Sequence, residues 1–363
     1  MAAIADCPPL TRESVQKAHE IVRKHVHLTP VVTNTTLNNI ASTPQSADAL
    51  EITEYKGRTP AKPKIRFFFK CENLQRIGAF KVRGAFHAIS RLPEEVRRKG
   101  IVTHSSGNHA QATALAAKTF GIQAHVIMPK ISTPSKVEAT KALGANVHFS
   151  GSTAPEREAV TNKVLGTLEP GAVILPPYDH PDIILGQGTL ALEFEQQVED
   201  LGSKLDAVIG PCGGGGMLSG TATALHGTGI RVYGAEPMHE GANDAQRGLA
   251  QGSRITDVST LTIADGLRTP LGEITWSVIS DKEKVRGLFS VTEEQIKAAM
   301  KLLMERAKLF VEPSACVGLA VALFNEDFRS LVEKEAGEDG WNVGIILTGG
   351  NTTIDAIIKL FST

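Results

Sequence analysis

The sequence has few cysteines, and they lie far apart. The four are Cys7, Cys71, Cys212 and Cys316, and they form neither a C-x-x-C pair nor a metal-ligand cluster. A disulfide-stapled secreted domain or a zinc finger needs such clustering. We therefore expect reduced thiols, as in a cytoplasmic enzyme.

An excess of charge and a long apolar run are also missing. The 38 basic and 39 acidic residues leave a net charge of -1, so no overall field attracts nucleic acid or an anionic membrane. No apolar run approaches the roughly 20 residues of a membrane span, and the first residues lack the basic start of a signal peptide. We expect a cytoplasmic protein without nucleic-acid or membrane partners.

Short Val/Ile-rich runs alternate with helical patterns, which predicts an α/β fold with parallel sheets covered by helices. The 363 residues, 42% of them hydrophobic, suffice for one or two packed cores. Expected strands are residues 123–128, 145–149, 205–210, 230–235 and 343–347, and expected helices are residues 110–120, 133–144, 217–226 and 292–309. Residues 41–64, rich in Pro, Ser and Thr, suggest a mobile surface insert.

Four consecutive glycines, Gly213 to Gly216, stand between an expected strand and an expected helix. Consecutive glycines let backbone N–H groups converge on one anion, and the helix N-terminus adds a partial positive charge. The run predicts a phosphate cup, although it is neither a Walker A loop nor a G-x-G-x-x-G fingerprint. Because Glu236 follows about 20 residues on, where a Rossmann unit carries its ribose-binding acid, a nucleotide-binding oxidoreductase stays open.

A second polar turn contains Ser105, Ser106 and Asn108 at an expected strand-to-helix boundary. Its hydroxyls, amide and freed backbone N–H groups suit a carboxylate, although helix capping alone explains them as well. A nucleophile elbow, G-x-S-x-G, needs glycine where His104 stands, so a hydrolase of that type is disfavoured.

Lys81 lies between Phe80 and small residues at the edge of an apolar stretch. An ammonium removed from water loses hydration, so its pKa falls and its neutral amine can form a Schiff base with an aldehyde. A solvated surface lysine is the ordinary alternative. Thr348, after the last expected strand, adds a hydroxyl at the sheet edge, and the acidic segment from Glu236 to Asp244 adds oxygen ligands suited to Mg²⁺ or Ca²⁺.

Together these segments resemble the fold type II (tryptophan-synthase-β-like) enzymes that use pyridoxal 5′-phosphate (PLP), most closely the serine racemase and serine/threonine dehydratase group. The shared motifs are Leu28-Thr29-Pro30, Phe80-Lys81-Val82-Arg83-Gly84, Ser105-Ser106-Gly107-Asn108-His109, Gly186-Gln187-Gly188-Thr189, Gly213-Gly214-Gly215-Gly216, Ile263-Ala264-Asp265-Gly266, Glu312-Pro313-Ser314-Ala315 and Thr348-Gly349-Gly350-Asn351. They cover nearly the whole chain except the insert and the N-terminus. The resemblance implies a homodimer with PLP between a small domain, residues 100–178, and a large domain, residues 1–99 and 179–363.

The resemblance also implies a role for each matching residue. Lys81 carries the cofactor as a Schiff base, and the Thr348 hydroxyl bonds the pyridine nitrogen. Further cofactor contacts are expected from Phe80, Asn108, Gly213, Gly214, Gly215, Gly216, Met217, Gly266 and Glu312. The substrate carboxylate is expected at Ser105, Ser106, Asn108 and His109.

A Mg²⁺ or Ca²⁺ site is implied at Glu236, the Ala242 carbonyl and Asp244. This assignment treats Met238 and His239 as an insertion relative to the family. Counted without the gap, the third ligand falls on Ala242, which has no carboxylate.

The implied reactions are elimination and racemisation of serine-like 3-hydroxy amino acids. Elimination needs one base, whereas inversion at Cα needs one on each face, and Lys81 and Ser106 match such a pair. A dedicated threonine or 3-hydroxyaspartate ammonia-lyase without racemisation is the alternative. Tyr178 stands near where racemases carry asparagine, so Arg157 or Arg268 can meet a second substrate carboxylate. Transamination is disfavoured, because a neutral partner leaves the ring nitrogen largely unprotonated, and feedback inhibition is not expected, because no regulatory domain follows residue 363.

Overall fold

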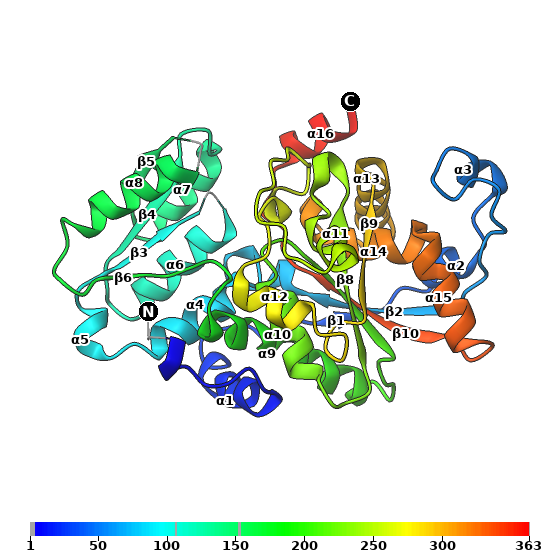
Figure 1. Ribbon diagram of the computed structural model, residues 1–363, viewed down its shortest axis with the longest axis horizontal. Helices are drawn as coiled ribbons and strands as arrows, with labels where there is room; N and C mark the ends of the chain where they lie inside the picture. Colours follow the sequence, from blue (N-terminus) through cyan, green and yellow to red (C-terminus); the bar gives the residue numbers. More distant parts are fainter. Residues whose placement is uncertain (1–3, 106, 152–153, 363) are drawn as a thin grey trace.

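The computed structural model describes residues 4–105, 107–151 and 154–362, which are built around two sheets (Figure 1). A six-stranded sheet has the order β1-β2-β10-β7-β8-β9, and a four-stranded sheet has the order β5-β4-β3-β6. The strands are β1 (Val31–Val32), β2 (Ile65–Cys71), β3 (Ile101–His104), β4 (Ala124–Pro129), β5 (Asn146–Ser150), β6 (Val173–Ile174), β7 (Ala207–Pro211), β8 (Arg231–Pro237), β9 (Gly287–Val291) and β10 (Trp341–Leu347). Neighbouring strands are parallel except β1 with β2, which confirms the two mainly parallel sheets predicted from sequence.

Helices cover both faces of each sheet. They are α1 (Arg12–Val22), α2 (Thr35–Ser42), α3 (Ala47–Glu51), α4 (Lys81–Ser90), α5 (Glu94–Arg97), α6 (Asn108–Thr119), α7 (Pro134–Ala142), α8 (Ala154–Leu165), α9 (Pro181–Asp200), α10 (Gly216–Leu225), α11 (Asp244–Gln251), α12 (Glu273–Ile279), α13 (Glu293–Leu302), α14 (Pro313–Phe324), α15 (Glu326–Ala336) and α16 (Ile354–Ser362). Side chains that alternate along a strand point to opposite faces. In β10, Val343 and Ile345 accordingly pack with α13, α14 and α15, whereas Ile346 packs with α9, α10 and α12.

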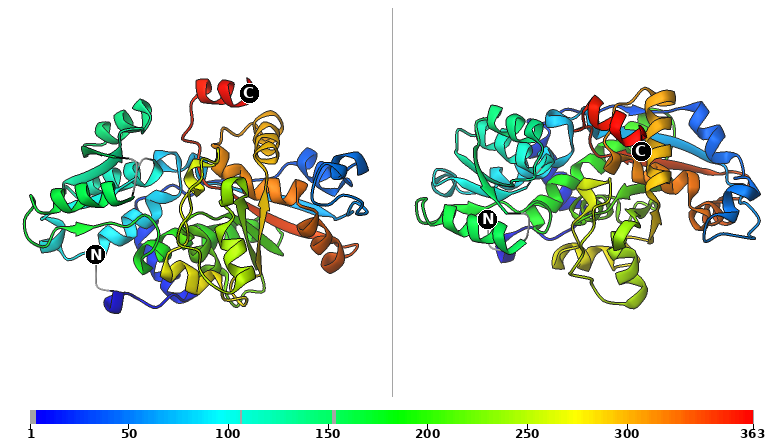
Figure 2. Two further views of the ribbon diagram at one scale, coloured as in Figure 1. Left: turned by 45° about the horizontal axis from the view of Figure 1, so that its top comes forward. Right: turned by 90° about the horizontal axis from the view of Figure 1, so that it is seen from above.

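The four-stranded sheet forms a separate lobe, seen on the left of Figure 1 and again in Figure 2. Ile101 of β3 packs with α4 and α6, and Val126 of β4 packs with α6 and α7. Val102 and Ile127 turn to the other face, where α8 covers them. The helix that begins at Lys81 therefore belongs to the core of the smaller lobe, although the strand before it lies in the larger sheet.

The strands expected from hydrophobic runs are confirmed, each within about two residues of its predicted ends. Thr292 caps α13 as predicted, since its hydroxyl accepts the Gln295 N–H and the Gln295 side chain accepts the Thr292 N–H. The expected helix to about residue 309 is α13 followed by a π-helical turn, Leu303–Ala307, which ends where Lys308 takes a left-handed conformation.

The insert of residues 41–64 lies at the edge of the larger lobe and contains the short helix α3 (Figure 1). Arg329 of α15 ties it down, because the buried guanidinium donates to the carbonyls of Ala41 (2.7 Å), Thr43 (2.8 Å) and Ala61 (3.2 Å). The same guanidinium pairs with Glu326 at 2.9 Å. A cation on a distant helix thus anchors a segment whose composition alone suggested a mobile loop.

Candidate active site

Lys81 sits where the two sheets meet. The chain leaves β2, passes two short turns and begins α4 at Lys81. The Phe80 N–H donates to the Thr348 carbonyl (3.1 Å), and the Gly350 N–H donates to the Gly78 carbonyl (2.9 Å). These bonds join the lysine segment to the loop after β10, so two motifs more than 260 positions apart in sequence are neighbours.

The Lys81 amine is enclosed, and no carboxylate among the described residues pairs with it. Its Nζ donates to the Pro177 carbonyl at 2.7 Å and lies 5.1 Å from the centre of the Phe80 ring. Burial lowers the pKa of Lys81 to about 8, because the charged form loses hydration. This is the environment expected of an amine that must act as a nucleophile near neutral pH.

The tetraglycine run forms the turn between β7 and α10, as predicted. Gly215 has φ +81°, and a Cβ there would lie 2.5 Å from a Leu271 methyl group, so only glycine fits. A Cβ on Gly214 would lie 2.5 Å from the Tyr178 ring. The backbone N–H groups from Gly213 to Met217 donate to no acceptor in the described part of the chain. Such converging N–H groups at the start of a helix suit a phosphate.

One segment connects the lysine with the glycine turn. Pro177 accepts the Lys81 hydrogen bond, and the Tyr178 ring packs on Gly214. The Asp179 carboxylate accepts the three N–H groups from Glu273 to Thr275 at the start of α12, each at 3.0 Å. The amine and the phosphate-type turn are thereby held on one scaffold.

The second polar turn also lies here, and Asn108 connects it with the large lobe. The Asn108 side chain donates to Glu312 (2.8 Å) and accepts from the Asn351 amide (2.7 Å). The Asn351 backbone N–H bonds the other Glu312 oxygen (3.0 Å). Burial and the nearby Asp265 raise the pKa of Glu312 to about 7, so its carboxyl group changes charge near neutral pH. The Gly266 N–H donates to the Ser314 hydroxyl (3.0 Å) at the start of α14, the helix that follows Glu312.

The residues expected to bind the substrate carboxylate lie at the start of α6, and the His109 ring is oriented away from that role. Its Nε2 faces the Leu175 carbonyl at 3.2 Å and must carry the proton, since a carbonyl only accepts. Burial and the Lys81 charge lower the pKa of His109 to about 3, which keeps the ring neutral. Its Nδ1 is then an acceptor, so the backbone N–H groups of Asn108 and His109 suit a carboxylate better than the ring does. The Ser105 hydroxyl accepts the Gly107 N–H (3.2 Å), and Ser106 lies outside the described residues.

The residues implied as metal ligands form a buried acidic pair beside the glycine turn. Glu236 and Asp244 are 1% and 3% exposed, and both lie close enough to Cys212 to raise its pKa. Glu236 accepts the N–H groups of Ala245 (3.0 Å) and Gln246 (2.8 Å). Burial raises the pKa of Glu236 well above its ordinary value and that of Asp244 to about 6.

Two adjacent buried carboxylates with no basic partner at hydrogen-bond distance are the donor set that a hard divalent cation stabilises. The two carboxylates therefore fit the implied site, whose third ligand is expected to be the Ala242 carbonyl. The three-ligand cluster found among the described residues is a different group, Cys7, His180 and Asp182.

Of the two arginines expected near the substrate, Arg268 is not available and Arg157 lies beside the site. Arg268 donates to the carbonyls of Thr262 (2.6 Å) and Leu261 (3.2 Å), so its guanidinium is committed to the backbone. Arg157, on α8, lies close enough to lower the pKa of His104 and to act on Tyr178, which places its charge beside the site. Of the two arginines expected to meet a second carboxylate, Arg157 is the better placed.

Sequence reasoning missed an ion pair across the site and a buried network beneath it. Lys136 of α7 pairs with Asp265 at 2.6 Å, which joins the small lobe to the Gly266 segment. Arg83 forms two-pronged ion pairs with Glu72 and Glu193. The sequence identified Arg83 only as part of a motif. Its ion pairs could not be predicted, because no local pattern shows which distant carboxylates lie beside it.

Comparisons with known proteins agree with this geometry. A serine racemase of Arabidopsis thaliana is 40% identical over 350 residues, with 96% of this chain and 95% of that protein covered. An L-threo-3-hydroxyaspartate ammonia-lyase of Saccharomyces cerevisiae is 38% identical, with 97% and 96% covered. The structure of maize serine racemase superposes with a TM-score of 0.83 at 38% identity and covers 97% of both chains.

The family model described as pyridoxal-phosphate dependent enzyme matches residues 52–349. The nucleotide-binding alternative is thereby wrong, and Glu236 bonds the backbone of α11 instead. No described helix is long and apolar enough to cross a membrane. The glycine turn with its unpartnered N–H groups and the enclosed amine of Lys81 fit a phosphorylated aldehyde, and the chain belongs to the pyridoxal-phosphate dependent enzyme family.

Proposed function

We propose that this enzyme eliminates water from serine-like 3-hydroxy amino acids and racemises serine, with Lys81 carrying the cofactor. The observation that supports it most is the enclosed Lys81 amine, with its pKa near 8, joined through Pro177 and Tyr178 to the glycine turn. Relatives named serine racemase and L-threo-3-hydroxyaspartate ammonia-lyase, each about 40% identical over nearly the whole chain, support the substrate class.

Different residues of the chain are proposed to bind the cofactor, to bind the substrate and to move the proton. Bound PLP would supply an electron sink that acidifies the substrate Cα–H. Gly213 to Met217 would hold its phosphate, while Phe80, Asn108, Gly266, Glu312 and Thr348 would surround the ring. The Thr348 hydroxyl makes no hydrogen bond with any described residue, which leaves it available for a ring nitrogen. The start of α6 would bind the substrate carboxylate, and the Lys81 amine would take the Cα proton.

Racemisation needs a second proton donor on the opposite face, and Ser106 is proposed for it. The alternative is an ammonia-lyase for 3-hydroxyaspartate, which the charge of Arg157 beside Tyr178 favours. Ser106→Ala is expected to abolish D-serine formation while keeping most L-serine elimination. Equal loss of both activities would contradict the two-base assignment.

The attachment of the cofactor is tested on the purified enzyme. Reduction with borohydride is expected to bleach the cofactor absorbance and to add its mass to Lys81 alone. Lys81→Ala should carry no such mass, and Lys136→Ala, which removes another lysine near the site, should keep it. Mass added at a different lysine would contradict the assignment. A panel of L-serine, L-threonine and 3-hydroxyaspartate, scored for keto acid and for D-amino acid, then ranks the substrates.

We further propose a Mg²⁺ or Ca²⁺ ion at Glu236, Asp244 and the Ala242 carbonyl. The ion would neutralise the acidic pair and join the end of β8 to the start of α11 behind the glycine turn. Chelation is expected to lower the melting temperature and activity, and added Mg²⁺ or Ca²⁺ to restore both. Glu236→Gln should be insensitive to chelation. An unchanged melting temperature in the unsubstituted enzyme would contradict the site.

The oligomer is proposed to be a homodimer, and the location cytoplasmic. Apolar side chains are exposed on α16, where Ile354, Ile358 and Phe361 are 61%, 59% and 42% exposed. A contiguous exposed apolar surface of this kind is typical of an interface. The described cysteines are all free thiols, as expected of a reducing compartment.

A further inference from the structure

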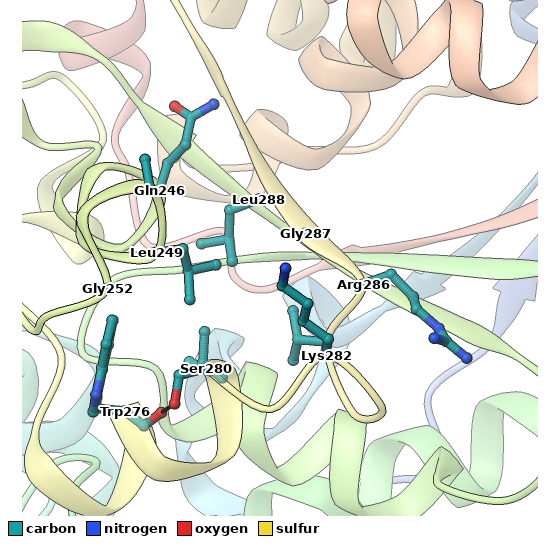
Figure 3. A pocket seen from close by; sticks show the side chains of 12 residues that line it. Gln246, Leu249, Gly252, Trp276, Ser280, Lys282, Arg286, Gly287 and Leu288 are labelled. Carbon is teal, nitrogen blue, oxygen red and sulfur yellow. Dashed lines mark hydrogen bonds between the residues drawn. The ribbon is translucent and has the colours of Figure 1, made fainter.

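A pocket of about 520 Å³ opens between α11, α12 and β9 (Figure 3). None of its lining residues belongs to the candidate active site. Leu249 and Leu288 both line it and are drawn next to each other in Figure 3. Ile279 and Val285, which are 0% and 1% exposed, also line it. Apolar side chains therefore form part of the lining, beside the polar Gln246, Ser280, Lys282 and Arg286.

Trp276 of α12 supplies one wall. Its ring packs against α11, since a Cβ on Gly248 would lie 3.2 Å from the indole Cζ3. The indole remains partly exposed to the pocket. A flat apolar ring is the shape that stacks on an indole and packs against leucine side chains.

Lys282 supplies the opposite wall, and its ammonium points toward the middle of the pocket in Figure 3. Within the described part of the chain, Lys282 has no ion pair, and no Asp or Glu lines the pocket. Arg286, at the rim, pairs with Glu283 at 3.6 Å. One unpaired cation beside an apolar wall is complementary to a single carboxylate.

The absence of a side chain at Gly287 keeps this space open. A Cβ there would meet no atom within 4 Å, and its φ lies outside the left-handed region. Neither packing nor backbone conformation requires glycine at this position of β9. What glycine preserves is the volume of the pocket.

We propose that this pocket binds a small carboxylate attached to a flat apolar ring. The ring lies against Trp276, Leu249 and Leu288, and the carboxylate meets Lys282. Occupancy holds α11, whose Gln246 lines the pocket and donates its backbone N–H to Glu236 at 2.8 Å. Gln246 thereby connects a ligand in this pocket with the start of α11. Binding of the ligand does not depend on the reaction at Lys81.

Benzoate, with benzamide as its neutral counterpart, tests the proposal on the PLP-bound enzyme through tryptophan emission. The signal belongs to Trp276, because the second tryptophan, Trp341, is 3% exposed beneath Arg231, and Trp341→Phe should keep it. We expect a Kd of about 1 mM for benzoate, as small ligands of this size allow, and at least about fivefold weaker binding of benzamide.

Three variants decide where benzoate binds. Lys282→Ala is expected to weaken binding about fivefold, the size of an exposed ion pair, and Gly287→Val to abolish it. Lys284→Ala is the matched control, because Lys284 lines the neighbouring pocket and pairs with Asp281 at 3.7 Å, so the Kd should not change. Equal Kd values for the unsubstituted enzyme and Lys282→Ala, no tryptophan response, or a response of the cofactor absorbance alone would each overturn the proposal.

Discussion

Glu312 is the carboxyl group of the site with the clearest pH signature. Its pKa is raised from 4.5 to about 7 by burial and by Asp265, although Asn108 and the Asn351 N–H oppose the shift. Between these values the unfolded chain has lost the proton that the folded protein keeps. The raised pKa therefore adds to the free energy of unfolding, fully so below about pH 4.5. This contribution is lost as the pH rises toward 7.

Glu312→Gln is expected to remove this dependence from the cofactor-free protein. The free energy of unfolding of the unsubstituted protein should fall by about 3 kcal/mol more than that of the variant between pH 4.5 and 7.5. Urea unfolding at several pH values measures the difference. Parallel pH curves for the two proteins would show that Glu312 keeps an ordinary pKa.

Arg83 has the same exposure as a core residue, 0%, and follows the reactive lysine by two positions. Its guanidinium bonds Glu72 (2.8 Å) and Glu193 (2.7 Å), and Lys70 joins Glu193 at 2.9 Å. Removing one partner of a buried ion network leaves charges without compensation, which costs more than the pair contributes on balance.

Arg83→Met is accordingly expected to lower the free energy of unfolding by about 3 to 5 kcal/mol. Arg98→Met, which removes an exposed pair with Glu94, should change it by less than about 1 kcal/mol. Denaturant unfolding of both variants gives the comparison. A similar small change in both would mean that the network beneath α4 is energetically neutral.

At the scale of elements, local patterns predicted what local interactions determine. The capping box at Thr292 and the strand-turn-helix around Gly213 to Gly216 depend on residues close in sequence, and both were predicted. The insert depends on Arg329, almost 290 positions from Ala41, and its anchoring was not predicted. Likewise, the local sequence singled out Lys81 and Glu236, but only the fold shows that Pro177 and the start of α11 are their partners.

Lys136 and Asp265 form the ion pair that joins α7 to the segment of Gly266. With side chains 21% and 42% exposed, the pair is expected to contribute less than about 1 kcal/mol. If it favours the arrangement in which the small lobe covers the substrate, Lys136→Ala should raise KM about twofold at low ionic strength.

The difference should disappear near 1 M salt, where the screening length is about 3 Å. Lys118→Ala, which removes an exposed lysine of α6 in the same lobe, serves as the control for net charge. A KM for Lys136→Ala that does not respond to salt would assign Lys136 to substrate binding instead.

For the whole molecule, the arrangement of the two lobes explains why the reactive groups meet. The larger sheet supplies the glycine turn and the loop after β10, whereas the smaller lobe supplies α6 with its free N–H groups. Among the described residues, the side chains of Asn108 and Lys136 bond the smaller lobe to loops of the larger sheet at the site. We propose that residues 100–178 move against the loops of the larger sheet, so that the bonds made by Asn108 and Lys136 change.

The exposed face of α16 is the feature that only an assembly of whole molecules explains. Figure 2 shows the helix at the edge of the molecule, beyond both sheets. Ile357 packs toward the core, while Ile354 and Ile358 remain 61% and 59% exposed. In a symmetric dimer the same patch on two copies covers itself.

Replacing Ile354 and Ile358 together with lysine is therefore expected to convert the dimer to a monomer at micromolar concentration, since four buried ammonium groups would face one another across the axis. Leu201→Lys, a matched change at an apolar side chain that is 57% exposed elsewhere, should leave the mass unchanged. Sedimentation equilibrium measures the masses, and the circular dichroism of the variants shows whether each is folded. A double variant that stays dimeric and folded would place the interface elsewhere. A monomeric unsubstituted enzyme would exclude the dimer, because the α16 surface would then be exposed without a partner.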